Sequence, residues 1–251
     1  MTDEFDVLAR WTVEAVQRLG PDHALPAACQ GSGGPAVLAW LAEELGLGPD
    51  TWLLDLGAGT GGPAEHAARG TGTHVVPVEP MPGACAAART LFRSPVVVGG
   101  EGRLPFVDAS FDAAWSLGVL CTVGDDRAQA AHLGELARTV GPEGIVGLLV
   151  YERTVEELSR QPEGNHFPRY ADLAAELAAA GLRVVTERML DDLPGPPQDW
   201  QDAAARVDAE VERAHGTDPA WRHASEQRSV LGDLLTDGQV RGRLLVCRPT
   251  G

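Results

Sequence analysis

The sequence of 251 residues predicts a single α/β domain whose sheet is mostly parallel and carries helices on both faces. Short apolar runs alternate with segments of helical periodicity along most of the chain. One apolar run, Trp52–Leu56, turns through Gly57, Gly59 and Gly61 into a helical pattern that starts near Pro63. A strand, a glycine turn and a helix in this order open a nucleotide-sized site in a parallel sheet, so this stretch is expected to organise the fold.

Seven apolar runs are expected to form the strands, and eight helical segments are expected to alternate with them. The predicted strands cover residues 52–56, 75–79, 95–98, 111–117, 144–150, 184–190 and 243–248. The predicted helices cover residues 4–19, 33–46, 63–69, 81–92, 128–140, 170–180, 199–215 and 219–235. Residues 21–36, up to the start of the second helix, are rich in Gly and Pro and are predicted to be loop-like.

This domain is expected to have four parts. Residues 1–46 are predicted to form an N-terminal helical cover, and residues 47–190 the cofactor-binding core. Residues 191–242 are predicted to be a helical insertion, because this long connection between the last two strands contains two helical patterns; residues 243–251 hold the last strand. The insertion is expected either to close over the substrate side or to pair with a second copy in a homodimer.

Composition excludes several kinds of function. The formal net charge is −16, whereas nucleic-acid binding depends on Lys and Arg that neutralise phosphates, so no nucleic-acid partner is expected. The absence of lysine excludes a lysine Schiff base and a lysine-bearing phosphate loop. The four cysteines lack the paired spacing of a zinc or redox site, so no metal is expected. Without a signal-like start or a membrane-length apolar run, the sequence favours a cytoplasmic protein with no membrane contact.

The glycines by themselves do not choose a cofactor. Gly57, Gly59 and Gly62 satisfy the spacing of the dinucleotide fingerprint, and Glu79 lies at about the expected spacing to bind a ribose. Asp55 changes the balance, because a carboxylate at the end of the first strand would repel a pyrophosphate and attract an ammonium group. These residues therefore favour a nucleoside that carries an amino acid over NAD.

At these positions the sequence resembles the class I S-adenosylmethionine-dependent methyltransferases, in particular their small-molecule branch. Four matches follow one another in the family's order over residues 51–151: Trp52–Gly61, Val75–Glu79, Arg103–Phe106 followed by Phe111–Ser116, and Gly141–Gly144. The resemblance implies a Rossmann-like methyltransferase fold with seven mostly parallel strands and with S-adenosylmethionine as the cofactor. Gly100 departs from the family pattern, in which an aspartate commonly binds adenine, and Cys121 stands where many relatives carry histidine.

The resemblance also implies which residues bind the cofactor: Asp55, Gly57, Gly59, Glu79, Gly100, Glu101, Gly102 and Leu117. Asp55 would orient the methionine ammonium group, and Glu79 would accept hydrogen bonds from both ribose hydroxyls. Glu101 would replace the missing adenine-binding aspartate, and the backbone of Leu117 would lie near the methionine. The glycines would admit the cofactor or bind it through their backbone.

The acceptor side of the site gives weaker signals. His166, in the turn-rich loop after the fifth strand, is the predicted general base, because a neutral imidazole can take up a proton near neutral pH. Four further residues are predicted to contact the acceptor: Trp11, His23, Cys121 and Tyr170. Each of these residues also has an ordinary alternative role in packing or at the surface.

The sequence thus predicts an S-adenosylmethionine-dependent methyltransferase. Its acceptor is expected to be a small molecule of specialised or natural-product metabolism, methylated on oxygen or nitrogen. Two alternatives also fit the residues: an enzyme with this fold that catalyses a non-methylating reaction such as cyclisation, and a non-catalytic binding protein. The identity of the acceptor is not encoded in any motif that the sequence contains.

Overall fold

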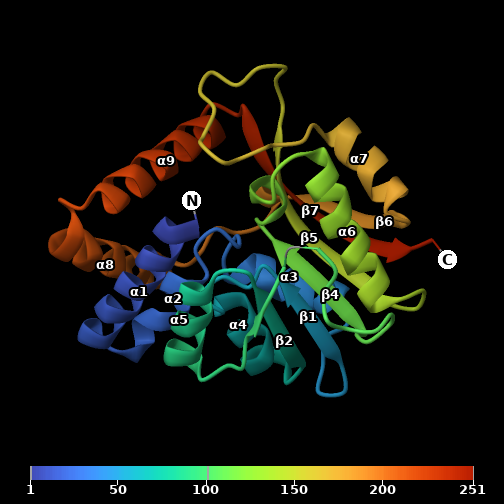
Figure 1. Ribbon diagram of the computed structural model, residues 1–251, viewed down its shortest axis with the longest axis horizontal. Helices are drawn as coiled ribbons and strands as arrows, with labels where there is room; N and C mark the ends of the chain where they lie inside the picture. The colour runs from blue at the N-terminus through green and yellow to red at the C-terminus, as the bar shows by residue number, and fades with distance from the viewer. Residues whose placement is uncertain (1, 101, 251) are drawn as a thin grey trace.

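The computed structural model describes residues 2–100 and 102–250, and within these residues seven strands form one sheet (Figure 1). The strand order is β3-β2-β1-β4-β5-β7-β6. All neighbouring pairs are parallel except the two that involve β7, which runs antiparallel to β5 and β6. The prediction of a mostly parallel, Rossmann-like sheet is therefore confirmed.

The strands lie close to their predicted positions. Their bounds are Trp52–Leu56 for β1, His74–Glu79 for β2, Val97–Val98 for β3, Ala113–Leu117 for β4, Ile145–Arg153 for β5, Leu182–Met189 for β6 and Val240–Pro249 for β7. The edge strand β3 is shorter than predicted, whereas β5 and β7 are longer because they pair with each other along eight residue pairs.

The helices also follow the predicted pattern, with one addition. Their bounds are Thr2–Leu19 for α1, Ala24–Ala28 for α2, Pro35–Glu44 for α3, Gly62–Thr71 for α4, Pro82–Phe92 for α5, Asp126–Val140 for α6, Tyr170–Ala179 for α7, Gln198–His215 for α8 and Pro219–Thr236 for α9. Three short 3-10 turns are Pro21–His23 (η1), Leu120–Thr122 (η2) and Leu190–Asp192 (η3).

The prediction of a loop over residues 21–36 is wrong where η1 and α2 form. Pro26 lies in the first turn of α2, where its missing N–H costs nothing because the first helical N–H groups have no partner within the helix. Ala24, Ala27 and Ala28 are buried, so tertiary packing stabilises a helix that the Gly and Pro content argued against.

Two apolar layers sandwich the sheet. On one face, α6 and α7 bury Leu133 and Leu173 against β1, β4 and β5. On the other face, α3 buries Leu38 and Leu41 against Leu53 of β1 and against β4, β5 and β7. Because strands β1 and β4 are covered on both sides, their residues are almost all buried, as the continuous apolar runs predicted.

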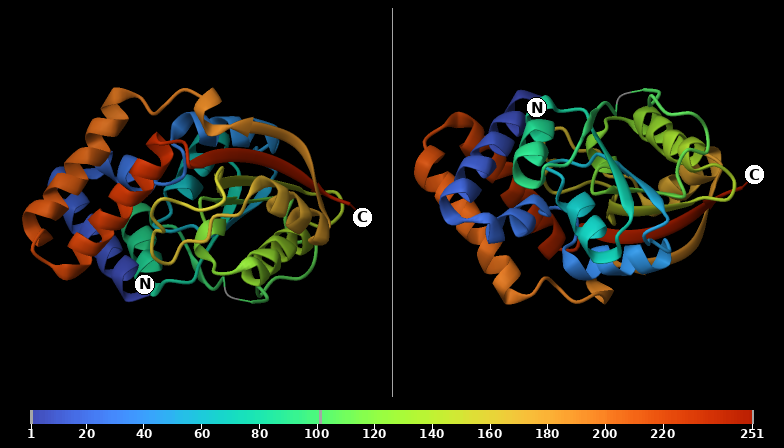
Figure 2. Two further views of the ribbon diagram at one scale, coloured as in Figure 1. Left: turned by 90° about the horizontal axis from the view of Figure 1, so that it is seen from above. Right: turned by 90° about the horizontal axis from the view of Figure 1, so that it is seen from below.

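A third group of helices lies at one end of the molecule, and we call α1, α2, α8 and α9 the helical cap (Figure 2). The connection between β6 and β7 supplies α8 and α9, which pack through Val207 and Trp221 on Trp11 of α1. Helix α1 also docks on α5, where the Asp6 carboxylate accepts hydrogen bonds from the first N–H groups of that helix. Among the described helices, none is long and apolar enough to cross a membrane.

Candidate active site

The candidate site lies where the carboxyl ends of β1 and β4 meet. The chain leaves β1 toward β2 and β3 on one side and returns to β4 and β5 on the other. This reversal is the switch point at which open α/β sheets bind ligands. The topology brings five of the predicted cofactor residues to this edge: Asp55, Gly57, Gly59, Glu79 and Leu117.

The turn after β1 is fixed by the neighbouring strand. The N–H groups of Gly57 and Ala58 both donate to the carbonyl oxygen of Val78, at 2.9 and 3.0 Å. Gly57 has φ +83°, and a Cβ at this position would lie 2.5 Å from Cγ2 of Val119, so the backbone and the packing both require glycine. Gly59 has φ +54° and no described neighbouring atom within 4 Å of a Cβ position. The turn is therefore tightly packed at Gly57 and open at Gly59.

Glu79 ends β2 beside this turn and is only 5% exposed. Its Oε2 accepts a hydrogen bond from the N–H of Gly59 at 2.8 Å, and its Oε1 accepts one from the N–H of Met81 at 3.1 Å. Burial raises the pKa of Glu79, and the two N–H donors oppose that rise. A carboxylate offers about four acceptor positions, so Glu79 keeps capacity for the hydroxyl groups of a ligand.

Asp55 is 2% exposed, and its Oδ2 has no hydrogen-bond partner among the described residues. The indole N–H of Trp115, which pairs with Asp55 across β1 and β4, likewise has no partner within that part of the chain. Burial raises the pKa of Asp55 to about 7, and the charge of Glu79 adds to the rise. A buried carboxylate is costly unless a donor or a cation pairs with it, so this geometry fits a ligand with an ammonium group.

The predicted adenine side is built from backbone. Gly100 has φ +138° and lies against Pro80, where a Cβ would come within 3.1 Å of the proline ring. Gly102 has φ +77° and is exposed. Glu101, the predicted substitute for the adenine-binding aspartate, lies outside the described residues. This side of the site is therefore characterised by two glycines whose conformations most other residues rarely adopt.

Cys121 and Tyr151 lie together beyond the end of β4. Cys121 is buried in η2, its Sγ lies 3.6 Å from the carbonyl oxygen of Gly118, and burial raises the pKa of its thiol to about 12. The protonated thiol is therefore suited to lining a wall and not to nucleophilic attack. The Tyr151 hydroxyl donates to the carbonyl oxygen of Gly31 at 3.3 Å. Tyr151 directly follows the predicted strand 144–150, but the sequence gives no signal for its pairing with a residue 120 positions away.

His166 and Tyr170 follow β5 but lie in different surroundings. The backbone N–H of His166 donates a hydrogen bond to the carbonyl oxygen of Cys121 at 2.7 Å, and this bond holds the loop against η2. The His166 ring places Nε2 2.6 Å from Oδ1 of Asp126, at the start of α6. The Tyr170 hydroxyl instead donates a hydrogen bond to the carboxylate of Glu187 in β6 at 2.7 Å. The guanidinium carbon of Arg243 lies 4.0 Å from the centre of the Tyr170 ring. His166 thus lies nearer the carboxyl edge of β4 than Tyr170 does.

The two remaining predicted acceptor residues belong to the N-terminal region. Trp11 is 5% exposed and stacks on the ring of His215 at 4.2 Å, inside the helical cap. His23 ends η1, and its Nδ1 is buried without a hydrogen-bond partner within residues 2–100 and 102–250. The packing of Trp11 accounts for its burial without a ligand, whereas the unpartnered His23 nitrogen has no structural explanation. Contact of these residues with an acceptor stays a prediction.

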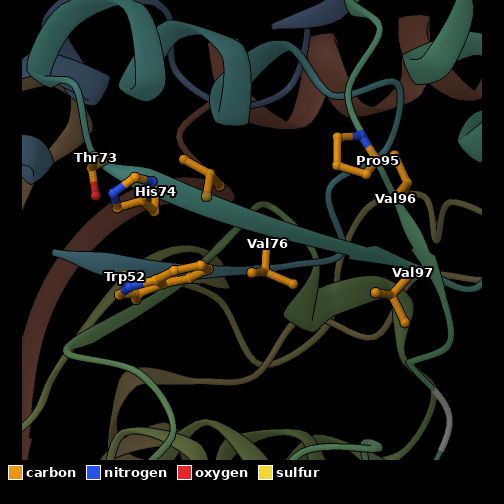
Figure 3. A pocket seen from close by; sticks show the side chains of 8 residues that line it. Trp52, Thr73, His74, Val76, Pro95, Val96 and Val97 are labelled. Atoms are coloured by element: carbon orange, nitrogen blue, oxygen red, sulfur yellow. The ribbon is translucent and has the colours of Figure 1, made fainter. Parts of the chain in front are cut away.

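A separate pocket of about 470 Å³ lies at the amino ends of the strands, away from the candidate site, around the first residues of β1, β2 and β3 (Figure 3). Trp52 and His74 stack on each other there, with ring centres 4.9 Å apart, and Val76 and Val97 continue its apolar floor. The residues that line it include none of the predicted site residues. Elsewhere in the described chain, no three His, Cys, Asp or Glu side chains cluster as a metal site would require.

Comparison with known proteins agrees with the class that the fold and site define, a class I methyltransferase fold. Residues 54–148 match the family model of a methyltransferase domain. The matched region begins within β1 and contains β2 and β4, so over these residues the chain is similar to methyltransferase domains.

The similar proteins differ in what they do. Sterol 24-C-methyltransferase of Yarrowia lipolytica is 26% identical over 221 residues, which are 84% of this chain and 56% of that protein. The chain spans about half the length of the curated relatives that it matches: 56% of this protein, and 40% and 47% of two other sterol methyltransferases. The crystal structure of the cyclase SpnF is 20% identical with a TM-score of 0.63, over 86% of this chain and 80% of that chain. A methyltransferase from Geobacter sulfurreducens, in complex with S-adenosylhomocysteine, is 20% identical with a TM-score of 0.58. The match covers 87% of this chain and 93% of that chain.

Proposed function

We propose that this protein transfers a methyl group from S-adenosylmethionine to a small-molecule acceptor. The observation that carries the proposal is the buried, unpartnered Oδ2 of Asp55, one turn away from the Glu79 carboxylate. The two carboxylates flank the glycine turn and suit the ammonium and the ribose hydroxyls of one nucleoside ligand. The similar structure that contains S-adenosylhomocysteine supports the same ligand class.

The side chains of the site have binding and positioning roles in this proposal. When bound, S-adenosylmethionine supplies an activated methyl group, so the protein mainly has to align the acceptor and exclude water. Asp55 would hold the ammonium group and Glu79 the ribose hydroxyls, while Gly59 leaves room for the ligand. Leu117 and Cys121 are buried and would form the apolar wall beside the reacting centre. Gly100 and Gly102 would contact adenine through their backbone.

The acceptor is proposed to carry a hydroxyl or amino group in specialised metabolism. The pairing of His166 with Asp126 supports this choice, because a carboxylate that orients an imidazole suits removal of a proton from such an acceptor. The net charge of −16 favours a small molecule over a nucleic acid. The sterol methyltransferase relative acts at carbon, which makes a carbon acceptor the alternative within the same reaction class.

Cyclisation is the second candidate function, and the similarity to SpnF favours it. In that case the fold would hold a reactive conformation of a substrate and release the product without methylation. The Asp55 carboxylate would then have a smaller part in the reaction itself.

Binding and turnover experiments separate these functions. Calorimetry with S-adenosylmethionine, S-adenosylhomocysteine and NAD is expected to detect the first two ligands and not the third. NAD binding alone would reject the proposal, and the absence of binding by all three would favour a non-catalytic protein. Mass spectrometry with a deuterated methyl donor and a panel of metabolites is expected to reveal a labelled product. An isomerised product of unchanged mass would favour cyclisation.

A further inference from the structure

Residues 28–34, which we call the glycine segment, lie across the carboxyl ends of β1 and β4. At its start, Ala28 and Cys29 press on α4, because a Cβ on Gly62 would come within 2.4–2.7 Å of their backbone atoms. In its middle, a Cβ on Gly118 would lie 2.7 Å from the carbonyl oxygen of Gly31. The segment is therefore in direct backbone contact with both sides of the candidate site.

Cys29 of the glycine segment belongs to the apolar cluster that contains Leu53 of β1 and Leu117 of β4. Cys29 is 3% exposed and lies close enough to Asp55 for the carboxylate charge to act on its thiol; burial and that charge raise the pKa of Cys29 to about 12. Asp55 itself is 2% exposed. A ligand whose ammonium group pairs with Asp55 would therefore lie close to this segment.

The backbone of the segment is suited to a change of conformation. Gly31, Gly33 and Gly34 have φ of +83°, +80° and +84°, and glycine moves between left-handed and extended conformations at little cost. Two side chains from outside fasten the segment among the described residues: Tyr151 at Gly31, and Asp208 of α8 at Gln30. The first of these bonds connects the segment to the sheet itself.

We infer that the glycine segment is a gate over Asp55 and that Tyr151 is the positioning residue that holds the gate closed. The hydroxyl of Tyr151 donates a hydrogen bond to the carbonyl oxygen of Gly31, which lies against Gly118. Removal of this hydroxyl leaves the aromatic ring in place and frees the carbonyl oxygen. The purpose of the gate, admission of the methyl donor, rests on the proposed function. The latch itself is a property of the protein without any ligand.

The test measures how fast Cys29 is alkylated by iodoacetamide, by peptide mass spectrometry of the full chain. Tyr151→Phe is expected to accelerate alkylation of Cys29 by about two- to tenfold, the change in opening expected when one neutral hydrogen bond is lost. Cys247, which is 0% exposed in the sheet, should be unaffected and reports general unfolding. The matched control is Tyr170→Phe, because Tyr170 is the other tyrosine and its hydroxyl contacts Glu187 instead.

Gly62→Ala tests the movement of the segment independently. The new Cβ would force the backbone of Ala28 and Cys29 away, so Cys29 should react faster than in the wild type. Because residue 62 does not have a left-handed φ, the substitution adds no backbone strain at its own position. Unchanged Cys29 alkylation in Tyr151→Phe, or an equal rise at Cys247, would overturn the assignment. So would acceleration by Gly62→Ala alone, because the segment would then move without Tyr151 acting as its latch.

Addition of S-adenosylhomocysteine connects the gate to the site. Saturating ligand is expected to slow alkylation of Cys29 in the wild type. If calorimetry detects binding and Cys29 is not protected, the gate is wrong and the proposed function stands. If no binding is detected while Tyr151→Phe still accelerates Cys29 alone, the latch stands and the proposed function fails.

Discussion

The two halves of the site differ in how far apart in the chain their residues lie. The half that we propose to bind the cofactor, the cofactor half, is formed by the ends of β1 and β2 and the turn after β1, where the N–H groups of Gly57, Ala58 and Gly59 donate hydrogen bonds to Val78 and Glu79. The half that we propose to bind the acceptor, the acceptor half, joins η2, the loop after β5 and the N-terminal segment, as in the contact of Tyr151 with Gly31. Local backbone geometry fixes the first half, whereas long-range packing fixes the second.

This difference predicts that substitutions in the two halves affect different measurements. A residue of the cofactor half should change ligand affinity or stability, because its contacts are part of the sheet edge. A residue of the acceptor half should change turnover, because its contacts hold a loop. The predictions below test this division from the largest expected effect to the smallest.

His166→Ala should produce the largest change. Loss of a general base lowers turnover by about 10²–10⁴-fold, while affinity for S-adenosylhomocysteine should stay the same because His166 pairs with Asp126 and not with the glycine turn. Initial rates with the acceptor found by mass spectrometry, measured across pH, provide the check. Asp126→Asn should give a smaller loss. Full activity of His166→Ala at every pH would remove His166 as the base.

Gly57→Ala and Gly59→Ala form a matched pair within the cofactor half. At Gly57 the new Cβ meets Val119 and the φ is left-handed, so the free energy of unfolding should fall by about 2–4 kcal/mol. At Gly59 only the left-handed φ acts, with a cost of about 1 kcal/mol, but the methyl group occupies the open side of the turn. Denaturant unfolding and calorimetry are expected to show weakened binding by Gly59→Ala in a nearly intact fold. Equal stability losses would contradict this distinction.

Glu79→Ala should weaken S-adenosylhomocysteine binding by about 1.5–3 kcal/mol, the usual worth of hydrogen bonds to a charged group. The same substitution removes the acceptor of the Gly59 and Met81 N–H groups, so a moderate loss of stability should accompany it. Calorimetry at a temperature well below unfolding separates the two effects. An unchanged dissociation constant would show that Glu79 does not bind the ribose.

The same division explains what the sequence could predict. The strand ends and the positions of Asp55 and Glu79 follow from apolar runs and glycine spacing, which act over a few residues. Helix α2 was missed because its stability comes from the burial of Ala24, Ala27 and Ala28 and not from local preference. The unpartnered indole of Trp115 was missed too, because one apolar strand residue resembles another until the neighbouring strand is known.

Asp55 predicts opposite pH dependences for binding and for stability. The ammonium group requires an ionised Asp55, whose pKa is about 7, so affinity for S-adenosylhomocysteine should rise with pH up to that value, about tenfold per unit. Asp55 binds its proton more tightly in the folded state than in the unfolded state, where its pKa is 3.8. The stability of the ligand-free protein should therefore fall as pH rises from 3.8 to about 7. Calorimetry and denaturant unfolding across this range measure both trends. Asp55→Asn should remove both, and a retained affinity trend in that variant would assign it to another group.

His223 predicts the smallest effect, in the helical cap. Its Nδ1 lies 2.7 Å from the Glu4 carboxylate of α1, and its Nε2 lies 3.1 Å from the carboxylate of Glu163 in the loop after β5. Hydrogen bonds to Glu4 and then Glu163 raise the pKa of His223 above its ordinary 6.5. The stabilisation is therefore fully present below pH 6.5 and is lost as pH rises through the raised value.

The measurement is the difference in melting temperature between the wild type and His223→Gln across pH. Because the imidazole is exposed, the difference should be small, with the wild type more stable at acidic pH and the two proteins equal once the imidazole is neutral. Glu163→Gln should reduce the difference, because it removes one of the two carboxylates. A difference that persists unchanged at alkaline pH would mean that His223 contributes through packing, and that the charge does not connect the cap to the loop of the acceptor half.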